Sequence, residues 1–138
     1  MLLVGATAMS EFEYYEAIMM SVELSALASM NFLAIVAMYL IAAYVAGKQL
    51  PRSIAVGTSL IYTMFVIPPF VGSLGNMNRG HDLGVQAQAI FPESVVFQGT
   101  AIPLEAYLVL FGVPMLIGWM GSIYFMHSYI RNQQLRDS

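Results

Sequence analysis

The stretch Leu24–Gly47, with the sequence LSALASMNFLAIVAMYLIAAYVAG, carries no charged residue. As a helix it would be about 36 Å long at about 1.5 Å per residue, enough to cross a hydrocarbon core about 30 Å thick. Only 9% of the residues in the chain are charged and 59% are hydrophobic, whereas soluble domains have about 25% charged residues. This stretch is therefore predicted to be a transmembrane helix, and the rest of the chain is organised around it.

Two further uncharged runs follow it, over residues 53–78 and 106–130. A chain of 138 residues has room for one domain that contains three such helices. We therefore expect an all-α integral membrane protein with a single membrane domain over residues 1–138. Its spans should lie at about 24–47, 53–74 and 104–130, with a loop at about 75–102.

Capping and helix-breaking residues predict where these helices end. Ser10 and Glu13 have the spacing of a capping box, so the first helix should start directly after Ser10 and protrude from the membrane by about three turns. Pro68 and Pro69 lack backbone N–H donors, so the second helix should kink or end there. Pro114 predicts a kink inside the third span.

The loop at 75–102 is the one sizeable segment predicted to lie outside the membrane. It contains more apolar residues than a disordered segment usually has: Val85, Ile90, Phe91, Val95, Val96 and Phe97. We expect this outer loop to be ordered and to fold against the protruding start of the first helix. Arg79 should then meet one of the N-terminal glutamates.

The basic residues predict how the spans are threaded. Lys48 and Arg52 lie between the first two spans, and Arg131 and Arg136 follow the third, so four of the five basic residues fall on one side. That side is predicted to be cytoplasmic, which places the N-terminus outside and the C-terminus in the cytoplasm. Seven of the eight acidic residues fall on the outer side. We place the protein in a bacterial cytoplasmic (inner) membrane.

The chain is rich in methionine, with eleven, and has no cysteine. Thioether ligands select Cu(I), and copper transporters with three spans carry an M-x-x-x-M pattern in the second span. Here the predicted second span contains only Met64, so the chain does not share that pattern. We interpret the methionines as adaptable packing residues.

Two histidines are the candidates for metal or cofactor binding. His81 could bind a metal with Asp82 and Met77, but Gly80 argues against a helix there, and a turn explains the same residues. We therefore expect no metal. His127 is the candidate cofactor ligand, for haem for example, although a histidine near a helix C-terminus also has an electrostatic explanation. No cofactor is predicted.

Glu23 lies at the outer boundary of the first span and shares a helix face with Glu16. Ionisable groups in a membrane are costly, which makes these two residues the candidate site for an ion or a partner. The alternative is that Glu23 lies at the level of the lipid headgroups and pairs with a cation such as Arg79.

Polar and small residues in the spans predict helix association. Asn31 lies deepest and must find a hydrogen-bond partner, so it should face another helix. Further small residues allow close approach between helices: Ser25, Ser29, Ala43, Gly47, Gly118, Gly121 and Ser122. Three helices leave much of their surface open, so part of it should contact other chains.

No group of residues has the composition of a catalytic site, and the net charge of −3 argues against a nucleic-acid partner. We expect a non-catalytic small multi-pass membrane protein, not an enzyme, that acts by helix packing. It would be an accessory or assembly subunit of a larger membrane complex or a self-associating scaffold. Its partners would be the lipid bilayer and other membrane subunits or copies of itself. The alternative is a homo-oligomeric channel or a carrier of cations or small solutes, with Glu16 and Glu23 around an acidic outer entrance.

Overall fold

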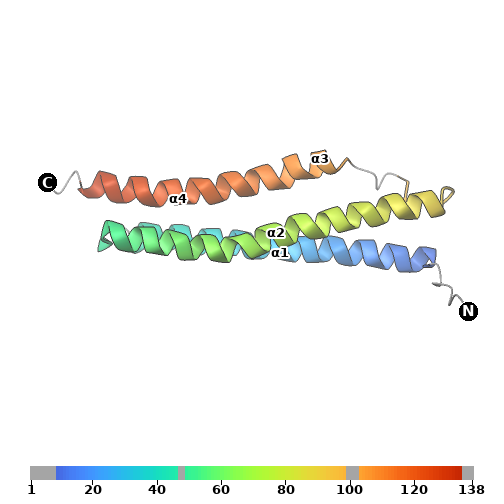
Figure 1. Cartoon of the computed structure of the whole chain (residues 1–138), viewed down its shortest axis with the longest axis horizontal. Helices are drawn as coiled ribbons and strands as arrows, with labels where there is room; N and C mark the ends of the chain where they lie inside the picture. Colours follow the sequence, from blue (N-terminus) through green and yellow to red (C-terminus); the bar gives the residue numbers. More distant parts are fainter. Residues whose placement is uncertain (1–8, 47–48, 99–102, 135–138) are drawn as a thin grey trace, which may run out of the picture.

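A computed structural model describes residues 9–46, 49–98 and 103–134, and it is all-helical (Figure 1). Helices α1 (Glu11–Ala46) and α2 (Arg52–Ile90) form an antiparallel hairpin. The third rod consists of α3 (Leu104–Tyr107), a π-helical turn η2 (Leu108–Gly112) and α4 (Val113–Gln134). In Figure 1 it runs beside the hairpin and ends level with the α1–α2 turn. We call this end the hairpin end and the opposite one the N-terminal end.

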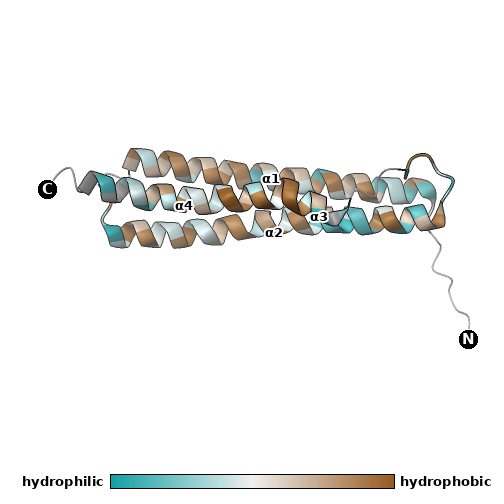
Figure 2. Ribbon diagram, turned by 90° about the horizontal axis from the view of Figure 1, so that it is seen from above, coloured by the Kyte–Doolittle hydropathy of each residue, from teal (hydrophilic) through white to brown (hydrophobic). Residues whose placement is uncertain are grey.

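The structure confirms the predicted all-α fold with three helices of membrane length. The stretches Glu11–Ala46, Arg52–Ile90 and Glu105–Tyr129 are each long and apolar enough to cross a membrane. Large hydrophobic side chains such as those of Met38 and Met64 are 71% and 72% exposed. Hydrophilic residues gather toward both ends of α2 (Figure 2). Such a surface suits contact with lipid tails.

Helix α1 begins where the capping box predicts. The backbone N–H of Ser10 donates to Oε2 of Glu13 at 2.6 Å, and the hydroxyl of Ser10 donates to the same oxygen at 2.9 Å. The backbone N–H of Glu13 donates in return to the Ser10 hydroxyl at 3.3 Å. These bonds satisfy amide groups that have no partner inside the helix. The predicted end of the helix at Gly47 falls outside the described residues.

Helix α2 does not end at Pro68–Pro69, and residue 75 does not begin a loop, so these two predictions are wrong. It continues through both prolines to Ile90. The small residues that suggested a loop form instead the face that packs on α1, because they recur at helical spacing: Ser73, Gly80, Gly84 and Ala87 are all buried. The close contact with α1 therefore outweighs the loss of two hydrogen-bond donors.

Residues 91–98 fold against the start of α1, as predicted for the outer loop. Phe97 is 1% exposed and clusters with Tyr14 and Ala87. The Phe91 ring meets the Tyr14 ring edge-on with centroids 6.1 Å apart. The Ser94 hydroxyl donates to a carboxylate oxygen of Glu11. The expected ion pair of Arg79 with a glutamate is not found among the described residues, and the order predicted for residues 99–102 falls outside them.

A second core joins the three rods toward the hairpin end. The rings of Tyr39 and Tyr62 stack with centroids 3.8 Å apart. The Tyr39 hydroxyl bonds to Ser59 at 2.7 Å, and the Tyr62 hydroxyl bonds to Ser122 at 2.8 Å. Each tyrosine hydroxyl thus has a hydrogen-bond partner inside an apolar cluster. The two bonds connect α1 to α2 and α2 to α4.

The irregularity predicted at Pro114 is a π-helical turn. The backbone N–H of Val113 donates to the carbonyl of Leu108, five residues earlier, in place of the usual four. Pro114 follows directly and has no N–H to donate. The widened turn η2 therefore accommodates the proline without ending the rod.

Candidate functional site

Ser25 and Ser29, which were predicted to support helix association, pack inside the hairpin. The hydroxyl of Ser25 donates to the carbonyl of Ser73 at 2.9 Å, and the hydroxyls of Ser29 and Ser73 lie 2.8 Å apart. Ser73 is fully buried. These serines therefore join α1 to α2, and Ser73 is a contributor that was not among the small residues predicted to support helix association.

The other predicted small residues lie in different surroundings. Ala43 and Ser122 are buried in the core toward the hairpin end. A Cβ atom at Gly118 would lie 4.0 Å from Cε1 of Phe32, whereas one at Gly121 would have nothing within 4 Å. Gly47 falls outside the described residues. Of the predicted small residues that are described, Gly121 is therefore the one with open space beside it.

Asn31 lies in a shallow groove between α1 and α2. The lining residues are Ala28, Asn31, Ala34, Ile35 and Met38 of α1 with Pro68 and Pro69 of α2, and we call this surface the Asn31 groove. The groove has a volume of about 450 Å³. Its lining contains no residue of the third rod, so it opens away from the bundle.

The Asn31 groove contains an unpaired polar side chain within the uncharged stretch of α1. Asn31 is exposed, and its side-chain amide has no hydrogen bond within the part of the chain that the structure describes. It lies about 7 Å along α1 from the middle of the uncharged stretch, at about 1.5 Å per residue. Pro68 and Pro69 cannot donate to the carbonyls of Met64 and Phe65, four residues earlier. Among the described residues no helix of the same chain covers Asn31, so the helix that it is predicted to face would belong to another chain.

Glu16 and Glu23 point away from the other helices. Both are exposed. At about 100° per residue they lie within about 20° of the direction opposite to the buried Phe32. Across residues 9–46, 49–98 and 103–134 neither carboxylate forms an ion pair, so the expected pairing of Glu23 with Arg79 is not seen. In one chain these carboxylates do not line a passage between helices.

His127 is half-buried near the hairpin end of α4. Its Nε2 atom lies 3.4 Å from the Ser59 hydroxyl, which also bonds to Tyr39. His81, the second of the two histidines, lies on the part of α2 near the N-terminal end. The two histidines of one chain therefore cannot ligate the same haem.

Met77 and His81 share one face of α2, contrary to the expectation that Gly80 would prevent a helix. Asp82 points elsewhere and accepts a hydrogen bond from the side chain of Asn78 at 3.2 Å. No three residues among histidine, cysteine, aspartate and glutamate gather into a metal site in the described part of the chain. The three predicted metal candidates thus do not converge on one point.

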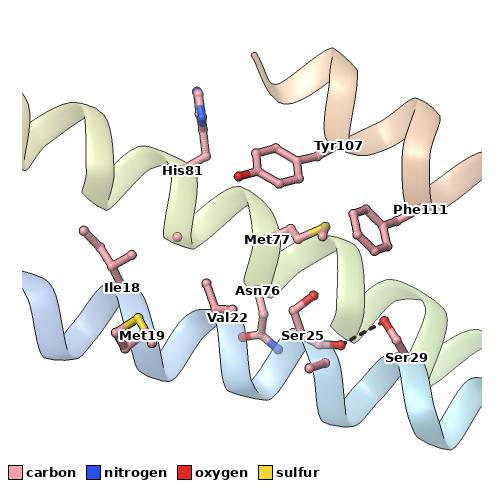
Figure 3. A pocket seen from close by; sticks show the side chains of 12 residues that line it. Ile18, Met19, Val22, Ser25, Ser29, Asn76, Met77, His81, Tyr107 and Phe111 are labelled. Carbon is pink, nitrogen blue, oxygen red and sulfur yellow. Dashed lines mark hydrogen bonds between the residues drawn. The ribbon is translucent and has the colours of Figure 1, made fainter. Parts of the chain in front are cut away.

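Met77 and His81 instead line a cavity of about 570 Å³ between the three rods (Figure 3). We call it the His81 cavity. Its walls come from α1, α2, α3 and η2: Ile18, Met19, Val22, Ser25, Ala26, Ser29, Asn76, Met77, Gly80, His81, Tyr107 and Phe111. This site was not predicted from the sequence, because residues 76, 77, 80 and 81 come together on one face only if that segment is a helix.

Comparisons with known proteins give no family for this chain. No protein-family model, curated protein sequence or solved structure matches it significantly.

Proposed function

We propose that the chain is a non-catalytic membrane protein that acts by helix packing, and that it self-associates through the Asn31 groove. The observation that carries this proposal is the exposed Asn31, whose side-chain amide has no hydrogen-bond partner among the described residues and which lies within a helix long and apolar enough to cross a membrane. An amide without a hydrogen bond in hydrocarbon costs roughly several kcal/mol. A second helix that supplies a hydrogen-bond partner removes that cost.

A second copy of the chain fits the groove better than an unrelated helix for a geometric reason. Copies with the same orientation in a bilayer place Asn31 at the same depth, and a two-fold axis along the membrane normal brings the two side chains together. An amide both donates and accepts, so two asparagines complement each other.

The surface around Asn31 also suits close packing. Ala28, Asn31, Ile35 and Met38 recur at intervals of three, four and three residues, so they form one stripe along α1. Ala28 and Ala34 allow the helix backbones to approach each other. A single polar residue within such a stripe also favours one alignment of the two helices.

The oligomeric state of the full chain in lipid nanodiscs tests this proposal. Substituting Asn31→Leu should weaken association about fivefold to thirtyfold, as expected for an interhelical amide pair worth about 1–2 kcal/mol. Asn78→Leu is the matched control because Asn78 is exposed in the C-terminal half of α2, outside the groove, and it should leave association unchanged. A chain that stays monomeric at a high ratio of protein to lipid would contradict self-association. A chain that co-purifies with a different membrane protein bound at the groove would also contradict it and would favour an accessory role.

The charges support a topology in which the hairpin end faces the cytoplasm, and we propose a bacterial inner membrane as the location. Arg52 lies at this end, Lys48 belongs to the same turn in the sequence, and Arg131 and Arg136 come near or after the end of α4. Basic residues are retained on the cytoplasmic side during insertion. The chain has no natural cysteine, so a cysteine introduced at Ser53 should react with impermeant reagents only after the membrane is opened. Labelling of this cysteine in intact cells would contradict this orientation and support the opposite one.

A further inference from the structure

We propose that the His81 cavity binds a neutral, lipid-soluble molecule whose planar ring carries carbonyl or hydroxyl oxygens, the chemistry of isoprenoid quinones. This inference is independent of self-association through the Asn31 groove, because the two sites share no lining residue.

The cavity exists because the third rod does not follow the hairpin closely at this level. Helices α1 and α2 are in close contact here, since a Cβ atom at Gly80 would lie 3.4 Å from that of Ser21. The third rod reaches the cavity with two aromatic side chains, Tyr107 and Phe111. The π-helical turn that carries Phe111 is a form of helix found often at functional sites. A volume of about 570 Å³ lies within the usual range of about 300–1,000 Å³ for small-molecule sites.

Unpaired polar atoms line one part of this apolar space. The Nδ1 atom of His81 is buried and has no hydrogen-bond partner among the described residues. Figure 3 shows the Tyr107 hydroxyl directed toward the part of α2 that carries His81, and within the described part of the chain no hydrogen bond of this hydroxyl is found. The amide nitrogen of Asn76 donates to the Gly72 carbonyl at 2.9 Å, which leaves its oxygen available. The Tyr107 hydroxyl and the Asn76 amide oxygen are therefore available to a polar ligand, because buried polar groups are usually hydrogen-bonded.

The walls indicate a neutral, planar ligand. The lining contains no lysine, arginine, aspartate or glutamate, so a phosphate headgroup would have no cation to neutralise it. Phe111 and Tyr107 form one wall, and the thioethers of Met19 and Met77 form others (Figure 3). Aromatic rings and methionine sulfur both pack well against a flat π-system. Ring oxygens would accept hydrogen bonds from the Tyr107 hydroxyl and from a ring N–H of His81.

The position of the cavity also suits an amphiphile. Ser25 and Ser29 line its deeper part within the uncharged stretch of α1, whereas Ile18 and His81 lie closer to the N-terminal end. The space is open on one side, because Val22 and Ala26 line it and are themselves exposed. An apolar tail could therefore leave the cavity toward the lipid while the ring remains inside.

Photolabelling tests this site. The full chain in phosphatidylcholine nanodiscs would be labelled with a photoreactive short-chain benzoquinone, competed with decyl-benzoquinone, and mapped by mass spectrometry. We expect labels on residues around the cavity and loss of labelling in Ala26→Phe, which fills the space from an exposed position. Ala42→Phe, on an exposed part of α1 outside the cavity, is the matched control and should be labelled like the unaltered chain.

Two further variants, each of which only removes side-chain atoms, keep the test valid if Ala26→Phe does not fold. Tyr107→Phe and His81→Ala should each weaken competition by decyl-benzoquinone about threefold to tenfold, the factor for one lost hydrogen bond. Tyr124→Phe and His127→Ala change residues of the same types outside the cavity and should have no effect. Labels spread along lipid-facing residues and insensitive to these variants would overturn the proposal. Competition by phosphatidylglycerol but not by decyl-benzoquinone would also overturn it, in favour of a lipid site.

Discussion

Substitution of Ser73 by leucine should separate the two helices of the hairpin. Ser73 is fully buried between α1 and α2, and its hydroxyl lies 3.3 Å from that of Ser25 and 2.8 Å from that of Ser29. Losing both contacts costs about 1 kcal/mol, at about 0.6 kcal/mol for an average hydrogen bond in a membrane protein. Forcing the longer side chain into a closed contact adds about 1–3 kcal/mol. We expect Ser73→Leu to lower the free energy of unfolding by about 2–4 kcal/mol and Ser73→Ala by about 1 kcal/mol.

Reversible unfolding in mixed detergent micelles would measure these losses. Far-UV circular dichroism follows the helices, and the fluorescence of the single tryptophan, Trp119, follows packing of α4 on α2, since its ring lies 6.3 Å from that of Phe70. Gly75→Leu is the matched control, because a Cβ atom at Gly75 has nothing within 4 Å. It should be neutral or slightly stabilising. If Ser73→Leu is as stable as Gly75→Leu, the inferred packing of α1 on α2 is wrong.

Three further substitutions test other parts of the fold. Tyr62→Phe removes the hydroxyl that bonds to Ser122 at 2.8 Å, and it should lower the free energy of unfolding by about 0.6–1.7 kcal/mol in the same assay. Tyr124→Phe, at an exposed position, should leave the free energy of unfolding unchanged. Equal values for the two variants would contradict the link between α2 and α4. Ser10→Ala removes the helix cap and should destabilise the first turn of α1 by about 0.5–2 kcal/mol. Hydrogen exchange should then become faster in that turn alone. Unchanged exchange there would argue against the cap. Phe97→Ala should destabilise the packing of residues 91–98 by about 3–5 kcal/mol. Limited proteolysis should therefore cut this segment rapidly in the variant and slowly in the unaltered chain. Rapid cutting of both chains would show that the segment is not packed.

The sequence predicted those features that depend on local chemistry. Long uncharged runs predict helices of membrane length, and the Ser10–Glu13 spacing predicts the start of α1, because both effects act within a few residues or one helix. The π-helical turn next to Pro114 is a local effect of the same kind, although its widened form could not be read from the proline alone.

The features that the sequence analysis missed depend on contacts between helices. Pro68 and Pro69 end an isolated helix, but α1 supports α2 beyond them through Ser73 and Gly80, and this contact is visible only in three dimensions. The His81 cavity was missed for the same reason, because it requires Met77 and His81 to lie on a continuous helix opposite the third rod. Gly72 and Gly80 thus mark close contact of α2 with α1 and not a loop.

Disulfide cross-linking between copies tests self-association most directly. The chain has no cysteine, so single cysteines can be placed at Ala28 or Ile35, beside Asn31, and at Met30 or Ala37, on another face of α1. A two-fold contact brings each cysteine of the first pair close to its own counterpart, within the range of about 4.4–6.8 Å between Cα atoms that a disulfide requires. We predict rapid cross-linking in membranes at Ala28→Cys and Ile35→Cys and little at Met30→Cys and Ala37→Cys. Equal cross-linking on both faces, or none at Ala28 and Ile35, would contradict the account.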